Sequence, residues 1–155
     1  MCFDQLLEIS KGLLTPLIAA VTAYIAFQQW KTNQQKLILD RYDRRLRMYE
    51  EVRKILSIIF RDGKASYDDL IKFRIAVSEA DFLFGSEIPE YLNDIYTHGV
   101  QLRSWSDQYR DYTQAIPEGY DHQKVCDGMQ TELKWLISQA ETAKEKFKKY
   151  LDISY

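Results

Sequence analysis

Two residues of types that can bind a metal lie four positions apart near the start of a predicted helix. His122 and Cys126 share one helix face if that helix begins early enough. Two ligands do not close a zinc site, which needs three or four, and His98 joins them only if the fold brings it close. An ordinary loop histidine and a buried thiol are the simpler interpretation, so we predict no metal site and no cofactor.

Carboxylates occur in close pairs, and an acid–base pair is the chemistry that they could perform. The pairs are Asp68 with Asp69, Glu87 with Glu90, and Asp107 with Asp111. Their positions in first helical turns or on polar helix faces indicate capping and solvation instead. The sequence also lacks a glycine-rich phosphate loop, a nucleophile elbow and a His-Glu-x-x-His motif. We therefore expect a protein that is not an enzyme.

Aromatic side chains suggest a binding surface. Trp105, Tyr109 and Tyr112 follow one another at spacings of four and three, so they lie on one helical face. Tyrosine and tryptophan are enriched at protein interfaces, and these three residues are a candidate docking patch. The alternative is that they pack in a helical core.

The chain is organised around Gly12–Trp30, nineteen uncharged residues between Lys11 and Lys31. Uncharged runs of 18 or more residues are candidates for a membrane-spanning helix, with Tyr24 and Trp30 as interfacial rings. A buried core helix of a soluble bundle and a cleaved signal peptide are the alternatives. Asp4 and Glu8 disfavour the signal peptide, because its first residues should be basic.

The basic residues predict an orientation. Residues 1–11 contain one, Lys11, and residues 31–47 contain six, so the positive-inside rule places the N-terminus outside and the C-terminal part in the cytoplasm. The six are Lys31, Lys36, Arg41, Arg44, Arg45 and Arg47. The expected organisation is an extracytoplasmic lead (1–11), a transmembrane helix (12–30) and a cytoplasmic helical domain (31–155). The lipid bilayer is then the first expected partner, and the inner membrane is the expected location.

From Gln28 to Arg61 the sequence contains no glycine or proline, so the helix is expected to continue beyond the uncharged run. Apolar residues recur at spacings of three or four over this stretch and form one stripe: Leu39, Tyr42, Leu46, Tyr49, Val52, Leu56 and Ile59. Later helices of the same chain or a second copy must cover the stripe. Ala19 and Ala23 are small residues four apart, which permits close helix association. Pro16 is expected in the first turn or at a kink.

Three further helices are predicted, which makes the fold class all-α. Ser66 and Ser86 are expected to cap the first two of these helices, and residues 115–123 form a loop before the last, at about 124–151. Its apolar stripe is expected to include Ile137, Ala140 and Phe147.

The net charge of −2 conceals an asymmetry, because residues 31–61 carry nine basic and four acidic side chains whereas residues 62–155 carry eleven and seventeen. The basic residues are interleaved with acids, and no nucleic-acid-binding module is visible, so nucleic acid is not an expected partner. Two cysteines do not form a disulfide framework.

Several segments resemble a family. The uncharged helix that ends in Trp30-Lys31-x-Asn33, the run Asp40–Arg45 leading to Tyr49–Val52, and Ala80–Gly85 resemble small, largely uncharacterised bacterial membrane-anchored helical proteins. The resemblance covers about residues 12–110 and implies a bacterial source and a single-pass anchor. It implies no catalytic residues.

These observations predict a non-catalytic, membrane-anchored helical scaffold or interaction protein that forms homo-oligomers, recruits a cytoplasmic protein partner, or does both. One alternative is a membrane effector that perturbs the bilayer, for example in antiphage defence. A second alternative is a soluble helical protein with an apolar core helix.

Overall fold

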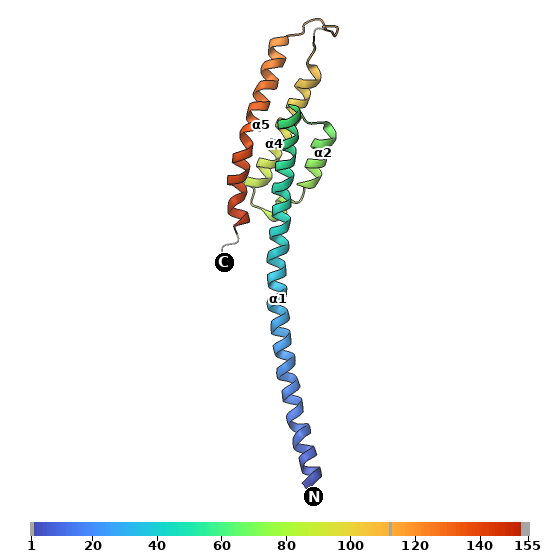
Figure 1. Cartoon of the computed structure of the whole chain (residues 1–155), viewed down its shortest axis with the longest axis vertical. Helices are drawn as coiled ribbons and strands as arrows, with labels where there is room; N and C mark the ends of the chain where they lie inside the picture. The colour runs from blue at the N-terminus through green and yellow to red at the C-terminus, as the bar shows by residue number, and fades with distance from the viewer. Residues whose placement is uncertain (1, 112, 153–155) are drawn as a thin grey trace. The chain divides into compact units, whose positions relative to one another are not determined.

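A computed structural model describes residues 2–111 and 113–152, with side chains for Leu14 and, from Pro16 onward, for the remainder of those ranges (Figure 1). Its regular elements are all helical: α1 (Cys2–Asp62), α2 (Tyr67–Ala76), α3 (Ala80–Leu83), α4 (Glu87–Gln108) and α5 (His122–Leu151). The predicted all-α class is confirmed. The chain divides into two compact units, Met1–Arg41 and Tyr42–Tyr155, and α1 contributes residues to both.

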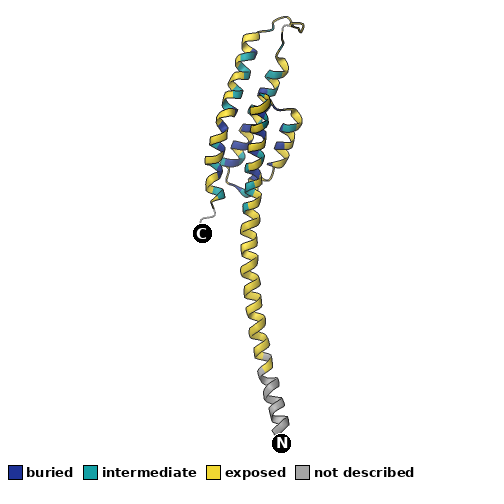
Figure 2. Ribbon diagram, viewed as in Figure 1, coloured by how far each residue is buried: buried dark blue, intermediate teal, exposed yellow. Residues whose placement is uncertain are grey.

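The first unit consists of the N-terminal part of α1. Every residue from Pro16 to Arg41 is exposed, as the yellow colouring of this part in Figure 2 shows. Its polar side chains bond within the helix: the Thr22 hydroxyl donates to the Ile18 carbonyl at 2.8 Å, and Thr32 donates to the Gln28 carbonyl at 2.9 Å. Pro16 lies inside α1, so its predicted place in a first turn is wrong, whereas the alternative of a kink at Pro16 stays a prediction.

The predicted membrane span is wrong. Within the described residues, no helix contains a stretch that is both long enough and apolar enough to cross a bilayer. The physical reason is that an uncharged run is not necessarily an apolar one. The side chains of residues 12, 13 and 15 of the predicted span lie outside the described residues. The continuous described part, residues 16–30, has polar residues near its end, Gln28 and Gln29, and its fifteen residues extend about 22 Å against a hydrocarbon core of about 30 Å. The prediction of a single-pass inner-membrane protein with its N-terminus outside is therefore corrected.

The second unit is a helical bundle. The residues of α1 from Tyr42 onward, α2, α4 and α5 alternate in direction, and α4 and α5 run antiparallel on either side of the loop that joins them (Figure 1). Their inward faces form one apolar core, in which Val52, Ile59, Ile88, Ile95 and Phe147 are fully buried. The bundle therefore consists of four helices around one core, as the sequence predicts: one long helix and three further ones. The short α3 is an additional helical turn.

The apolar stripe of α1 is buried in its C-terminal half and exposed at its N-terminal end. Val52, Leu56 and Ile59 are 2% exposed or less, because the later helices of the same chain cover them. Tyr42, Leu46 and Tyr49 are half-buried. Leu39, in contrast, is 51% exposed. Of the two predicted ways to cover the stripe, packing within the chain accounts for its C-terminal half.

The helix caps agree with the sequence in part. Ser66 forms a capping box with Asp69: the Asp69 N–H donates to Ser66 Oγ at 3.1 Å, and the Ser66 N–H donates to Asp69 Oδ2 at 3.2 Å. Ser86 makes no side-chain cap bond, because its backbone is already helical. α5 begins at His122, two residues earlier than predicted, with Asp121 as its cap. Ile137 and Ala140, which were expected to face inward, are exposed.

Ser66→Ala is expected to destabilise the second unit by about 1 kcal/mol, because the Asp69 backbone N–H loses its acceptor and the Asp69 carboxylate loses the Ser66 hydroxyl. Ser66 hydrogen bonds hold the pKa of Asp69 below its ordinary 3.8, so this stabilisation is present above pH 3.8 and is lost as the pH falls further through the lowered value. Urea unfolding of both proteins from pH 6 to pH 3 measures it. A stability difference that stays constant over that range would contradict the assignment.

Two glycines permit close helix packing in the second unit. A Cβ atom at Gly128 would lie 2.5 Å from Cε2 of Trp105, so the indole on α4 packs directly on the α5 backbone. A Cβ atom at Gly99 would lie 2.6 Å from Cδ2 of Leu70, where α2 meets α4. Gly99 therefore permits the close packing of α2 on α4.

Candidate functional site

Large hydrophobic side chains cover the described part of the first unit, and they are the most unusual feature of the molecule. Eleven of them are between 49% and 64% exposed: Leu14, Leu17, Ile18, Val21, Tyr24, Ile25, Phe27, Trp30, Leu37, Ile38 and Leu39. Contiguous apolar surface on this scale is rare on monomeric proteins and marks sites of association. We call residues 14–39 the apolar segment.

The apolar segment contains a heptad pattern. Leu14, Ile18, Val21 and Ile25 alternate at spacings of four and three, the a and d positions of a coiled coil. The same spacing continues through three polar residues, Gln28, Thr32 and Gln35, before it returns to Leu39. We call these eight residues the seam. Ile18, Ile25 and Thr32 fall at a positions, where β-branched side chains favour pairs of helices.

The small residues Ala19 and Ala23 lie on the opposite face of the same helix, which they share with Phe27 and Trp30. Successive residues of an α-helix are separated by about 100°, so Ala23 lies opposite the line through Leu14, Val21 and Ile25. Ala19 and Ala23, the predicted association residues, are both exposed. Association through either face stays a prediction, and the two faces are separable by mutation because they point in opposite directions.

The residues predicted to set membrane orientation lie in both units. Tyr24, Trp30, Lys31, Lys36 and Arg41 are exposed in the first unit. The phenol of Tyr24 accepts a hydrogen bond from Gln28 Nε2 at 3.0 Å, and the ring of Trp30 stacks on Phe27 at 6.1 Å between centroids. The side chain of Lys11 lies outside the described residues. Tyr24 and Trp30 therefore belong to the apolar segment itself, and Lys31 and Lys36 are charged residues within its C-terminal part.

Arg45 has a structural role that its charge did not indicate. Its guanidinium lies 5.7 Å from the centroid of the Phe84 ring and 5.5 Å from that of Tyr150. Arg45 Nε also donates to the Leu83 carbonyl at 3.1 Å. Arg45 therefore joins α1 to α3 and α5 by cation–π and hydrogen-bond contacts within the second unit. Arg44 and Arg47 are exposed.

The predicted docking patch is partly packed. Trp105 is half-buried against Gly128, whereas Tyr109 ends α4 and is 40% exposed, with its ring 5.5 Å from that of His122. Tyr112 lies outside the described residues. Docking through these side chains stays a prediction, and Trp105 has a clear packing role.

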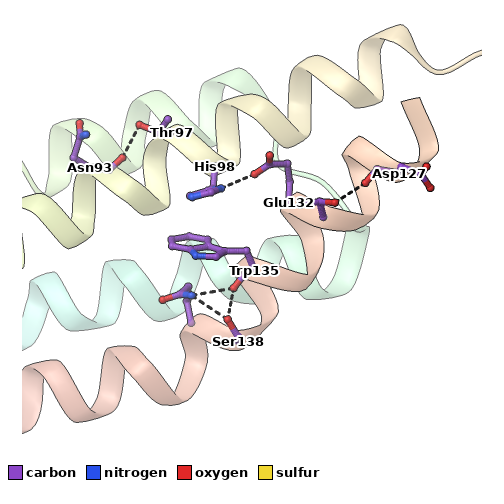
Figure 3. A network of polar contacts seen from close by, with 9 residues as sticks. Asn93, Thr97, His98, Asp127, Glu132, Trp135 and Ser138 are labelled. Carbon is purple, nitrogen blue, oxygen red and sulfur yellow. Dashed lines mark hydrogen bonds and ion pairs between the residues drawn. The ribbon is translucent and has the colours of Figure 1, made fainter. Parts of the chain in front are cut away.

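His98 joins α4 to α5. Its ring stacks on the indole of Trp135 with 3.7 Å between centroids, and Nδ1 lies 2.5 Å from Oε2 of Glu132 (Figure 3). The Glu132 side chain is only 13% exposed, so this contact satisfies a carboxylate that is largely removed from water. His98 is thus engaged between the two helices and does not join His122 and Cys126.

His122 and Cys126 do meet, as their spacing predicts. His122 Nε2 lies 3.4 Å from Cys126 Sγ, and Nδ1 lies 3.2 Å from the Tyr120 hydroxyl. The Arg110 backbone N–H donates to the same hydroxyl at 3.1 Å. Cys126 is a free, half-buried thiol and not a fully buried one. We call Tyr120, His122 and Cys126 the thiol cluster. Tyr120 was missed because its role depends on the folded loop.

The paired carboxylates form ion pairs and caps. Asp68 lies 2.6 Å from Lys72 Nζ, and Asp107 lies 2.7 Å from Arg103. Glu87 contacts Lys149 and, at 3.3 Å, Lys146, and both lysines lower the pKa of its carboxyl group. Burial raises the pKa of Tyr91, whose hydroxyl donates to the Gln139 carbonyl at 3.2 Å. No group of three or more potential metal ligands gathers among the residues with described side chains.

Two hollows of similar size lie on the second unit. One, of about 240 Å³, includes Arg74 and Asp81 in its lining. Arg74 already donates to Asn93 Oδ1 at 3.0 Å and lies over the Tyr96 ring. The other, of about 270 Å³, lies between α1 and α5 and is lined in part by Tyr49, Phe60 and Ala140. Neither brings together an acid, a base and a nucleophile.

Comparisons with protein-family models, with curated proteins and with solved structures found no match. The resemblance of residues 12–110 to small bacterial helical proteins stays a prediction. The function is therefore argued from the apolar segment itself.

Proposed function

We propose that this protein is a non-catalytic helical interaction protein that pairs with a second copy of itself through the seam of the apolar segment. The observation that supports the proposal most is the exposure of Leu14, Ile18, Val21 and Ile25 at heptad spacing, on a helix whose surrounding residues are all exposed. Moving one such half-exposed side chain out of water contributes about 1 kcal/mol, so several apolar layers together stabilise the association of two chains.

The order of the seam favours a parallel, in-register pair. In that arrangement each seam residue meets its own copy, so Leu14 to Ile25 form four apolar layers and Gln28, Thr32 and Gln35 form three polar layers. Facing glutamine side chains can bond to each other, because each carries both a donor and an acceptor. A polar layer of this kind fixes register at a cost in stability.

An antiparallel pair of the same length is disfavoured. It places Leu14 opposite Leu39, but Ile18 opposite Gln35, Val21 opposite Thr32, and Ile25 opposite Gln28. Three of the four distinct layers then bury an apolar side chain against a polar group that has lost its partner, which costs free energy at each layer. The order of apolar and polar residues along the seam therefore indicates that a second copy of this chain binds the seam in the parallel direction.

Lysines flank the seam and oppose the pairing weakly. In the parallel arrangement, Lys31 lies at a g position and faces Lys36 of the other copy at the following e position. Like charges at exposed positions cost a few tenths of a kcal/mol and are screened by salt. Lys36→Glu is expected to tighten the pair, because it converts both facing pairs into attractive ones.

Cysteine cross-linking tests the pairing. In a full-length background with Cys2→Ser and Cys126→Ser, Ile25→Cys is expected to form disulfide-linked dimers under mild oxidation, because a positions meet their own copies across a parallel seam. Ala23→Cys, on the opposite face, is the matched control and is expected to remain monomeric. Efficient cross-linking at Ala23 and none at Ile25 would assign association to the small-residue face instead.

A further inference from the structure

The thiol cluster is independent of the proposed pairing, since it lies in the second unit. Cys126 is not a lone cysteine: its Sγ has an imidazole nitrogen at 3.4 Å, and the other nitrogen of that ring has a phenolic hydroxyl at 3.2 Å. A thiol, a base that can take its proton and a group that orients the base are the three parts of an activated nucleophile.

The hydrogen bonds of Tyr120 define which tautomer of His122 can accept the thiol proton. The Tyr120 hydroxyl already accepts from the Arg110 backbone N–H, and its second lone pair can accept from His122 Nδ1–H. That tautomer leaves the lone pair of Nε2 facing the thiol of Cys126. When Nε2 takes the thiol proton, the imidazolium donates to Tyr120 on one side and to the thiolate on the other.

The local fold keeps these groups together and accessible. His122 opens α5 directly after its cap Asp121, and Cys126 follows one turn later on the same face. The Tyr109 ring lies 5.5 Å from His122, and the Tyr120 ring lies 6.0 Å from it. His122 is exposed and Cys126 is half-buried, so a small solute can reach the sulfur.

We propose that Cys126 is a reversible thiol-modification site that reacts with small disulfides, with His122 as its general base and Tyr120 as a positioning residue. The Cys126 thiol gives its proton to His122 Nε2, and its sulfur attacks one sulfur of the disulfide. The disulfide S–S bond breaks, a new bond joins Cys126 to the attacked sulfur, and the leaving thiolate takes the proton from the imidazolium. Cys126 sulfur is oxidised and the leaving sulfur is reduced, so atoms and electrons balance.

Kinetics with oxidised glutathione test this assignment. In full-length protein with Cys2→Ser, Cys126 is the remaining thiol, and mass spectrometry follows the addition of one glutathionyl group. His122→Gln is expected to slow the reaction about tenfold at pH 7, because the thiol loses its base. Tyr120→Phe keeps the ring and removes the acceptor, and it is expected to slow the reaction severalfold. His98→Gln, which removes the other histidine, is expected to react at the rate of the Cys2→Ser parent.

The pH profile separates a base from a merely structural residue. At pH 10 an ordinary thiol is already ionised, so the His122→Gln rate is expected to converge with that of the parent. A His122→Gln rate equal to that of the parent at pH 7 would overturn the proposal. A deficit that persists at pH 10 would also overturn it, because it would show altered access to the sulfur and not proton transfer. Neither outcome depends on whether the chain pairs through its seam.

Discussion

Full-length protein carrying Val21→Glu is expected to dissociate into monomers at concentrations where the wild-type chain is paired. Val21 is 52% exposed in the single chain and lies at the middle of the four apolar layers of the seam. In the pair, two carboxylates meet without partners in an apolar layer, which costs several kcal/mol. Since 1.4 kcal/mol corresponds to a factor of ten, the dissociation constant is expected to rise at least 100-fold.

Ala23→Glu is the matched control for Val21→Glu. It introduces the same charge two residues away, on the opposite face of the same helix, so the pair is expected to keep its wild-type dissociation constant. Analytical ultracentrifugation measures both variants, and circular dichroism checks that helix content is unchanged. Equal weakening by both substitutions would show a general effect of charge on the helix and would remove the support for a seam.

The second large effect is expected from Phe147→Ala, which is predicted to destabilise the second unit by about 3 to 5 kcal/mol. Phe147 is fully buried, with its ring 5.4 Å from Phe84 and 5.5 Å from Tyr49. It therefore joins α5 to α1 and to the residue that follows α3. Truncation removes both ring contacts and leaves a cavity, and much of the stability of a single small domain is then lost.

Phe82→Ala is the control for Phe147→Ala, because the chemical change is the same. Phe82 is 87% exposed, so its removal is expected to change the unfolding free energy by less than 0.5 kcal/mol. Urea unfolding followed by circular dichroism measures both. Similar losses for the two variants would contradict the arrangement of the core.

The sequence predicted the second unit well because its signals are local. The cap at Ser66 and the loop before α5 follow from residue type and from spacing along the chain. Ser86 failed as a cap since its own backbone continues the helix, which residue type alone does not determine. The burial of Val52 and the exposure of Ile137 depend on which helices pack together, which helical periodicity does not determine.

The first unit was misinterpreted for a different reason. The run between Lys11 and Lys31 is uncharged over a length that suits a membrane, but Gln28 and Gln29 make its C-terminal end polar. Gln28 also continues the heptad spacing of the apolar layers, together with Thr32 and Gln35, and the absence of charge does not indicate this spacing. The thiol cluster was half predicted, since helix spacing brings His122 to Cys126, whereas Tyr120 reaches His122 only through the loop.

The mass of the full-length wild-type chain in solution tests the central claim most directly. Sedimentation equilibrium over a range of concentrations is expected to show a reversible pair, with a mass twice the 18.4 kDa of one chain at the higher concentrations. Raised salt is expected to strengthen that pair, since Lys31 and Lys36 face each other across it. A constant mass of 18.4 kDa at all concentrations, or loss of the chain from solution only when lipid vesicles are added, would contradict the proposed pairing.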